Sequence, residues 1–233
     1  MRLRDLLGEA RAVFELGALP PSIPALLALS PRGDGQPVLT LPGLLASDRS
    51  MAILRRYLRE LGYSVHPWNL GRNLGPSSEL RAGMMQRLQE IHETVGRRVS
   101  IVGWSLGGIY ARELARHNPR MVRQVITLAS PFAAGMRMDN RYMDEALAER
   151  LRTPPPVPCT AIYTRHDGVV PWQTCREDDH PHTENIEIPA THVGIGVNPL
   201  ALYAIADRLA QPDGGWKRFE RSGVKALLYR EGA

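Results

Sequence analysis

The sequence predicts an α/β fold, a three-layer α/β/α sandwich around a mainly parallel sheet of about six strands. Short runs rich in Val, Ile and Leu, typical of strands buried on both faces, alternate with longer amphipathic segments over residues 38–210. Gly, Pro, Asn and Ser separate these segments, as turns require. With 233 residues, 43% hydrophobic and 23% charged, the chain suits one domain with a full core.

The chain divides into three parts by composition. Residues 1–37 hold an expected helix over residues 3–16, followed by a Pro-rich connector. The connector contains five prolines, so we expect it to be mostly extended, with one or two helical turns around residues 25–29. Residues 38–210 form the core, with a short lid insertion at residues 133–158, and residues 211–233 form a basic tail without a clear assignment.

Within the core, hydrophobic periodicity and turn residues define the expected elements. The strands are expected at residues 38–41, 63–67, 99–102, 122–128, 159–164 and 184–188, and the helices at residues 49–61, 77–95, 109–117, 141–151 and 199–209.

The net charge of +5 comes mostly from arginines spread over the expected helices. Acidic residues lie partly between them and few aromatic residues accompany them, which favours solvated helix faces over a nucleic-acid surface. We therefore predict no nucleic-acid partner, and weak contact with an anionic membrane surface is left open.

The location and redox state follow from what the sequence lacks. No run approaches the roughly 20 apolar residues of a transmembrane helix. The N-terminal segment carries Asp5, Glu9 and Glu15 within its apolar pattern, unlike a signal peptide, so we expect a cytoplasmic protein. Cys159 and Cys175 lie near opposite ends of one expected strand and its loop, so we expect free thiols.

Residues 99–108, V-S-I-V-G-W-S-L-G-G, organise the rest of the chain. A buried-type strand ends at Gly103, a helical pattern follows Gly108, and the residues between fit the G-x-S-x-G nucleophile elbow. In such a turn the serine hydroxyl is exposed on a strained backbone, and the residues two before and two after it must lack side chains. The pattern predicts Ser105 as a nucleophile.

Two further residues stand where active groups gather in a parallel sheet, beyond the carboxyl ends of the strands. Asp167 follows the expected strand at 159–164, and His192 follows the strand at 184–188. Each alone could be a loop residue, but the chain order Ser, Asp, His is the order of one known class of catalytic triad. We predict that Ser105, Asp167 and His192 act together.

In this hypothesis His192 takes the proton of Ser105, and Asp167 fixes the imidazole tautomer. An oxyanion would be held by the backbone N–H of Leu106 and by that of Leu44 or Gly43 in the turn after the first strand. Other acids and histidines receive weaker interpretations. Asp178 and Asp179 are alternatives to the triad acid, His66 has no assigned partner, His117 is interpreted as structural, and the acid- and His-rich residues 177–182 as a solvated loop without a metal.

With these motifs in place, residues 38–209 resemble the α/β-hydrolase superfamily, within it the bacterial lipase and esterase-like branch. The resemblance rests on the elbow, on Ser130-Pro131, on the Asp-Gly-Val-Val-Pro run of residues 167–171 and on Thr191-His192-Val193-Gly194. It implies an ester hydrolase without a cofactor and with the triad above. The sequence departs from the family in having Pro42 where many such lipases have His, and in lacking the usual antiparallel strands before the first parallel one.

The insertion at residues 133–158 indicates the substrate. Its methionines form a soft apolar surface, suited to an acyl or aliphatic group. The expected pocket residues are Trp104, Met136, Met138, Tyr142 and Met143. We predict cleavage of a short-to-medium acyl ester or thioester, with acyl transfer from the same acyl-enzyme, or a non-catalytic binding role, as alternatives; the oligomeric state is left open.

Overall fold

The computed structural model describes residues 12–133 and 145–229. Its six strands form a single sheet in the order β2-β1-β3-β4-β5-β6, with every neighbouring pair parallel. The strands are β1 Pro37–Leu41, β2 Ser64–Pro67, β3 Val99–Trp104, β4 Val122–Leu128, β5 Cys159–Tyr163 and β6 Thr183–Glu187. The predicted parallel α/β sandwich is confirmed, and each predicted strand differs from the observed one by two residues or fewer.

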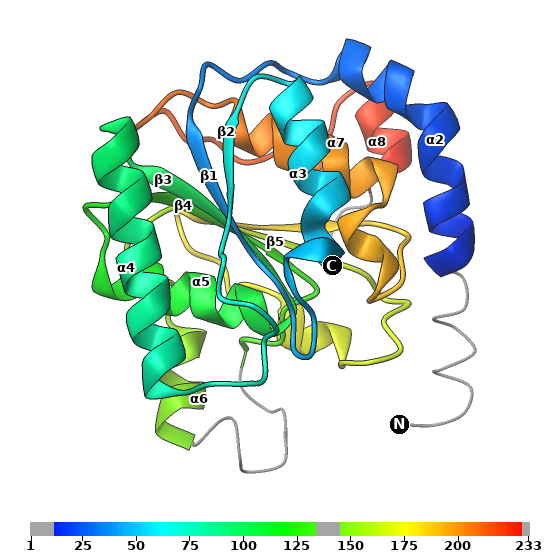
Figure 1. Cartoon of the computed structure of the whole chain (residues 1–233). Coiled ribbons are helices and arrows are strands. Elements are labelled where there is room, and N and C mark those ends of the chain that lie inside the picture. The colour runs from blue at the N-terminus through cyan, green and yellow to red at the C-terminus, as the bar shows by residue number, and fades with distance from the viewer. Residues whose placement is uncertain (1–11, 134–144, 230–233) are drawn as a thin grey trace.

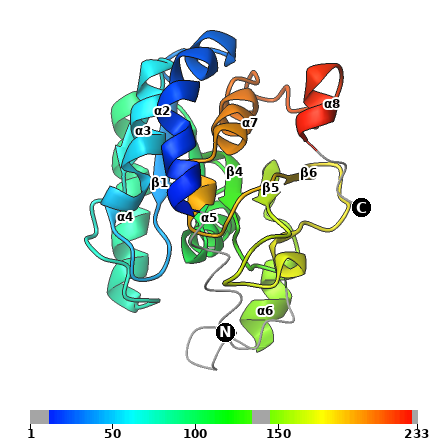
Figure 2. The same ribbon diagram turned by 90° about the vertical axis from the view of Figure 1, so that its right-hand side faces the viewer.

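Helices cover both faces of the sheet (Figures 1 and 2). Helices α2, α3 and α7 pack together on one face, and α4 and α5 cover the other, where α6 contacts α5. The helices are α2 Ala12–Leu29, α3 Ala52–Glu60, α4 Ser78–Val95, α5 Leu106–His117, α6 Glu145–Arg152, α7 Pro199–Leu209 and α8 Val224–Leu228; the short 3₁₀ turns are η1 Asp48–Met51, η2 Trp172–Cys175 and η3 Gly194–Gly196.

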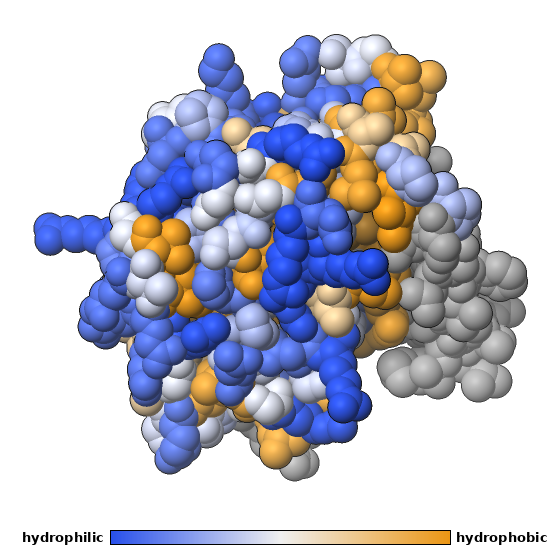
Figure 3. Space-filling model, turned by 45° about the horizontal axis from the view of Figure 1, so that its top comes forward, coloured by the Kyte–Doolittle hydropathy of each residue, from blue (hydrophilic) through white to orange (hydrophobic). Residues whose placement is uncertain are grey.

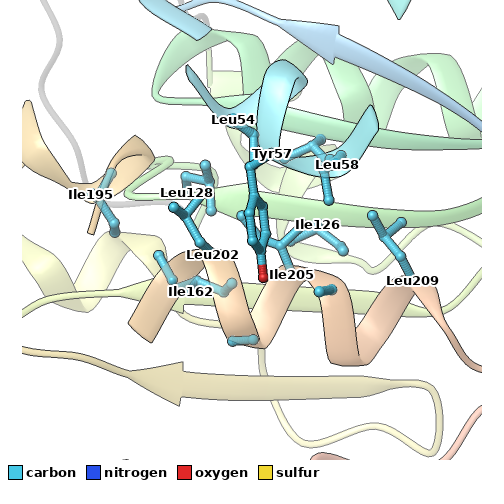
Figure 4. Packing of buried hydrophobic residues seen from close by; sticks show 14 of the residues in the cluster. Leu54, Tyr57, Leu58, Ile126, Leu128, Ile162, Ile195, Leu202, Ile205 and Leu209 are labelled. Carbon is cyan, nitrogen blue, oxygen red and sulfur yellow. The ribbon is translucent and has the colours of Figure 1, made fainter. Parts of the chain in front are cut away.

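Two hydrophobic clusters lie on the two sides of the sheet, because alternate residues of a strand point to opposite faces. In β3, Ile101 belongs to the cluster under α4 and α5, whereas Val102 belongs to the cluster under α3 and α7. Figure 4 shows the second cluster, where Tyr57 of α3 lies among Ile126 and Leu202. Because the strands are buried on both faces, their sequences are continuous apolar runs.

The N-terminal segment differs from the expectation. Helix α2 continues through Pro20, Pro21 and Pro24 to Leu29, so the extended connector begins only at residue 30. Proline opposes a helix interior, but α2 packs against α7 and its Leu26 is buried in the core. Tertiary burial of this face outweighs the local propensity. The part of the expected helix at residues 3–11 lies outside the described residues.

The C-terminal tail, left unassigned by the sequence, contributes two of its described residues to the core. Its residues Phe219 and Tyr229 belong to the cluster beside α7, with ring centroids 4.7 Å apart. The hydroxyl of Tyr229 donates to the carbonyl of Leu200 at 2.9 Å. The tail thus packs on the body of the domain, although exposed apolar residues remain on α8, among them Val224 and Leu227.

The surface opposite the carboxyl ends of the strands is mostly hydrophilic, with apolar residues gathered on the right-hand side of the view in Figure 3. None of the helices in the described ranges is both long enough and apolar enough to span a membrane.

Candidate active site

Ser105 occupies a sharp turn between β3 and α5. Its φ of 51° lies in the left-handed region, which is strained for a residue with a side chain. Three hydrogen bonds hold this backbone: the Ser105 N–H donates to Leu128 O at 2.9 Å, and Ser105 O accepts from the Ser130 hydroxyl at 2.6 Å and from Gly108 N at 3.0 Å. The predicted elbow is present, and neighbouring strand β4 supplies its support.

The glycines of the elbow are required by close backbone approach. A Cβ added to Gly103 would lie 2.4 Å from the carbonyl oxygen of Gly107. A Cβ added to Gly107 would lie 2.2 Å from the carbonyl oxygen of Leu41 in β1. Both distances are far below van der Waals contact, so a side chain at either position would displace α5 from the sheet and move Ser105 with it.

The three side chains predicted to act together do lie together at the carboxyl ends of β3, β5 and β6. His192 Nε2 lies 3.1 Å from Ser105 Oγ, and His192 Nδ1 lies 2.7 Å from Asp167 Oδ2. The second oxygen of Asp167 accepts the backbone N–H groups of Val169 and Val170, each at 2.8 Å. The imidazole and the carboxylate are buried, with 5% and 1% of their side chains exposed.

Contacts that the sequence did not indicate hold the histidine loop. Trp104 Nε1 donates to the carbonyl of His192 at 3.0 Å, and the two rings lie 5.9 Å apart. The buried hydroxyl of Thr164 donates to Ala190 O at 2.7 Å and accepts from His166 N at 3.1 Å. Thr164 therefore links the loop that carries Asp167 to the loop that carries His192.

The expected oxyanion donors lie beside the serine. Leu106 is the first residue of α5, so its N–H has no acceptor within the helix. A Cβ added to Gly43 would lie 3.2 Å from the Cβ of Ser105, which shows how closely this turn passes the nucleophile. Gly43 O accepts from Ala46 N at 3.2 Å; because the N–H and C=O of a trans peptide point in opposite directions, the Leu44 N–H points away from that bond.

The alternative acids do not reach His192. Asp179 is exposed and pairs with Arg218 at 2.5 Å, and the carbonyl of Asp178 accepts from the hydroxyl of Thr183. Asp167 is therefore the carboxylate that the fold brings to the imidazole.

The other two histidines that the sequence singled out also lie apart from the site. His66 Nε2 lies 2.9 Å from the hydroxyl of Ser64 in the edge strand β2. His117, at the C-terminal end of α5, lies 3.8 Å from Glu113.

Two cavities lie near these elements, one beside the chain neighbours of Ser105 and His192 and one along α5. A cavity of about 160 Å³ is lined by apolar residues that include Trp104 and Val193, the chain neighbours of Ser105 and His192. A larger apolar cavity of about 470 Å³ lies between α4 and α5. Of the predicted pocket residues, Trp104 lines the smaller cavity, whereas Met136, Met138, Tyr142 and Met143 lie outside the described residues.

Both cysteines are free thiols, as predicted. Burial raises the pKa of Cys159 and of Cys175, so both thiols stay protonated and unreactive at neutral pH. Within residues 12–133 and 145–229, no three His, Cys, Asp or Glu side chains lie close enough to hold a metal ion.

Solved structures resemble this arrangement over most of the chain. The similarity to lipase B of Aspergillus fumigatus has a TM-score of 0.63, with 16% identity over 79% of this chain and 55% of that one. For the mature lipase BlEst2 of Bacillus licheniformis, the TM-score is 0.54, with 17% identity over 76% and 92% of the two chains. For the pyrethroid hydrolase PytH, it is 0.55, with 19% identity over 75% and 97%. The chain has the α/β-hydrolase fold.

Sequence comparison adds a narrower finding to this α/β-hydrolase fold. A family model described as the PGAP1-like alpha/beta domain matches residues 70–151. That range holds Ser105 and its helix, but neither Asp167 nor His192. No curated protein matches the sequence significantly. The chain also spans only 55% of the length of the Aspergillus lipase.

Proposed function

We propose that this α/β-hydrolase is a serine hydrolase that cleaves carboxylic esters or thioesters through an acyl-enzyme on Ser105. The observation that carries the proposal is the unbroken series of hydrogen-bonding distances from Asp167 through His192 to Ser105. A serine hydroxyl is a weak nucleophile until an oriented base removes its proton. Orientation of that base by a buried carboxylate is what distinguishes this arrangement from a chance contact.

The reaction follows from the positions of the polar atoms. Ser105 Oγ attacks the carbonyl carbon while His192 Nε2 takes its proton, and Asp167 stabilises the imidazolium. The negative oxygen of the tetrahedral intermediate is held by backbone N–H groups of Leu106 and of Leu44 or Gly43. His192 then protonates the leaving alcohol or thiol. Water then attacks the acyl-enzyme in the same way, with His192 as the base, and the carboxylic acid is released.

Exposed apolar side chains around this centre favour a substrate with apolar parts. Leu45, Leu74, Val169 and Val193 follow β1, β2, β5 and β6, and each has about half or more of its surface exposed. The 160 Å³ cavity beside Trp104 offers room for a small apolar group. Together with the lipases and the pyrethroid hydrolase among the similar structures, these features support short-to-medium acyl esters as substrates.

Fluorophosphonate labelling followed by peptide mapping tests the proposal. We expect one label per chain on Ser105, no label in Ser105→Ala, and labelling slowed about 10⁶-fold in His192→Ala. The matched control is Ser222→Ala, which removes an exposed hydroxyl that donates to Glu220. The proposal of an activated serine would be refuted if the folded wild-type protein took up no label, or if it hydrolysed none of a panel of acyl esters and thioesters.

Acyl transfer remains the alternative outcome for the same acyl-enzyme. Adding a primary alcohol or amine to the hydrolysis assay separates the two reactions, because a transferase forms the transferred ester or amide in preference to the acid. Water exceeds a millimolar acceptor in concentration by roughly four orders of magnitude, which favours hydrolysis. Transferred product formed under these conditions would therefore identify the protein as a transferase.

A further inference from the structure

Asn73 contacts the oxyanion turn at three points, although it lies in the loop after β2 and far from the triad in sequence. Its backbone N–H donates to Ala46 O at 2.8 Å, and its carbonyl accepts from Leu45 N at 2.7 Å. Its side-chain Nδ2 donates to Pro42 O at 2.9 Å. The residue is fully buried. These bonds enclose Gly43 and Leu44, the two candidate oxyanion donors in the turn that passes close to Ser105.

The clamped turn is strained, which explains why it needs support. Leu45 has a φ of 60°, a conformation that costs a non-glycine residue on the order of 1 kcal/mol or more. Its side chain is exposed, so packing of that side chain does not hold the conformation. The bond from Leu45 N to Asn73 O and the bond from Asn73 Nδ2 to Pro42 O fix the Leu44–Leu45 and Pro42–Gly43 peptides. These two peptides flank the Gly43–Leu44 peptide, which carries the N–H of Leu44.

The remaining oxygen of Asn73 points to the helix that carries the other donor. Tyr110 Oη lies 3.3 Å from Asn73 Oδ1, which also accepts Gly75 N at 3.2 Å. Tyr110 follows Leu106 by four residues, one turn along the same face of α5. One amide side chain therefore contacts both the turn that holds Leu44 and the helix that begins at Leu106.

We propose that Asn73 is a positioning residue that sets the spacing between the two oxyanion donors. The inference rests on the proposed serine hydrolase function and assigns to it a residue outside the triad and the donors. Preorganised N–H groups stabilise an oxyanion only at the correct distance, and a misplacement of about 1 Å can cost about 100-fold in rate. Asn73 touches no reacting atom and acts through the turn and the helix.

Three variants separate positioning from general stability. Asn73→Asp has the same shape, but it places an acceptor against Pro42 O while keeping an oxygen toward Tyr110. Tyr110→Phe removes the hydroxyl that contacts Asn73 and keeps the ring. Asn118→Asp is the matched control, because Asn118 Nδ2 also donates to a backbone carbonyl, that of Leu114, at the far end of α5.

The measurements are kcat and KM on a p-nitrophenyl ester, inhibition by phenylboronic acid, and thermal unfolding. A boronic acid forms a tetrahedral adduct on a serine Oγ, so its affinity reports on the oxyanion donors. In Asn73→Asp we expect kcat to fall about 10- to 100-fold, KM to change less than about threefold, and the boronic acid inhibition constant to rise in proportion to the loss of kcat. In Tyr110→Phe we expect a smaller fall in the same direction.

Asn118→Asp should lose thermal stability without losing kcat or boronate affinity. Folded Asn73→Asp with the wild-type kcat, a fall in kcat without weaker boronate binding, or an equal fall in Asn118→Asp would overturn the positioning role. Failure of the wild type to label at Ser105 would instead overturn the proposed function itself, and the positioning role with it. Should Asn73→Asp not fold, Tyr110→Phe decides the question by the same criteria.

Discussion

Two buried carboxylates in the segment between β5 and β6 are held in different ways. Asp167 accepts two backbone N–H groups on one oxygen and faces the imidazole of His192 with the other. Glu177 faces the guanidinium of Arg112, and both side chains are fully buried. The second oxygen of Glu177 has no partner among the described residues.

The difference separates a carboxylate that orients His192 in the proposed function from one that joins elements. The backbone N–H groups of Val169 and Val170 bind one oxygen of Asp167 and leave the other oxygen to face His192. Arg112 instead neutralises Glu177 and also donates to Leu151 O at the end of α6, while its guanidinium lies 3.9 Å from the ring of Phe132. That ion pair ties α5, α6 and the loop after η2 together.

Replacement of Asp167 should have the largest effect. In Asp167→Asn the bonds from Val169 and Val170 can remain, but the new amide donates to His192 Nδ1 and places the proton on Nε2, where a base is needed. We expect kcat to fall about 10⁴-fold with little loss of stability, measured by ester hydrolysis and thermal unfolding. Asp179→Asn, an exposed acid in the same segment, is the control; equal activity of the two variants would refute the assignment.

Breaking the ion pair should affect stability instead of chemistry. Glu177→Gln leaves the Arg112 charge buried without its counter-ion, so the free energy of unfolding should fall by about 3 kcal/mol. Denaturant titration measures this, and kcat per folded molecule should stay within about threefold. The double variant Arg112→Met/Glu177→Leu should recover part of the loss; a double variant less stable than Glu177→Gln would show that the pair stabilises beyond its desolvation cost.

The smallest expected effect concerns His66, a partly buried imidazole whose ring contacts the hydroxyl of Ser64. Burial, and then the charges of Arg87 and Arg59, lower its pKa below the ordinary 6.5. Between the lowered pKa and 6.5 the unfolded chain binds more protons than the folded one, so this contribution to stability is full above pH 6.5 and is lost as the pH falls. Wild type should therefore lose more stability than His66→Gln between pH 7 and pH 5 in thermal unfolding; parallel losses would contradict the shift.

The sheet and the elbow could be predicted because their signals are local. β-Branched runs mark β3 and β4, and glycines two residues on either side of Ser105 mark the elbow. Asp167 and His192 could be found because the ends of parallel strands meet at one edge. Position at a strand end favours Asp167 over Asp178 and Asp179, and the distance to His192 supports that choice.

The features that could not be predicted depend on contacts between distant segments. Prolines argue against a helix at residues 20–24, and only packing on α7 explains why α2 continues there. In the sequence, Asn73 cannot be distinguished from the other polar residues of its Gly- and Asn-rich loop, because its partners Pro42 and Tyr110 are 31 and 37 residues away. Nothing in the sequence indicates that Phe219 belongs to the core.

The C-terminal segment affects whether the sheet can associate with other chains through its edge. Strand β6 is an edge strand, which could pair with a strand of another chain. Arg221 donates to the backbone carbonyl of Asn185 in β6, and Phe219 N donates to the carboxylate of Glu184. The segment thus blocks edge-to-edge association, and at the opposite edge β2 has only four residues and ends in Pro67. Aggregation through either edge of the sheet is therefore obstructed. The C-terminal segment packs along β6, and β2 is short and ends in a proline.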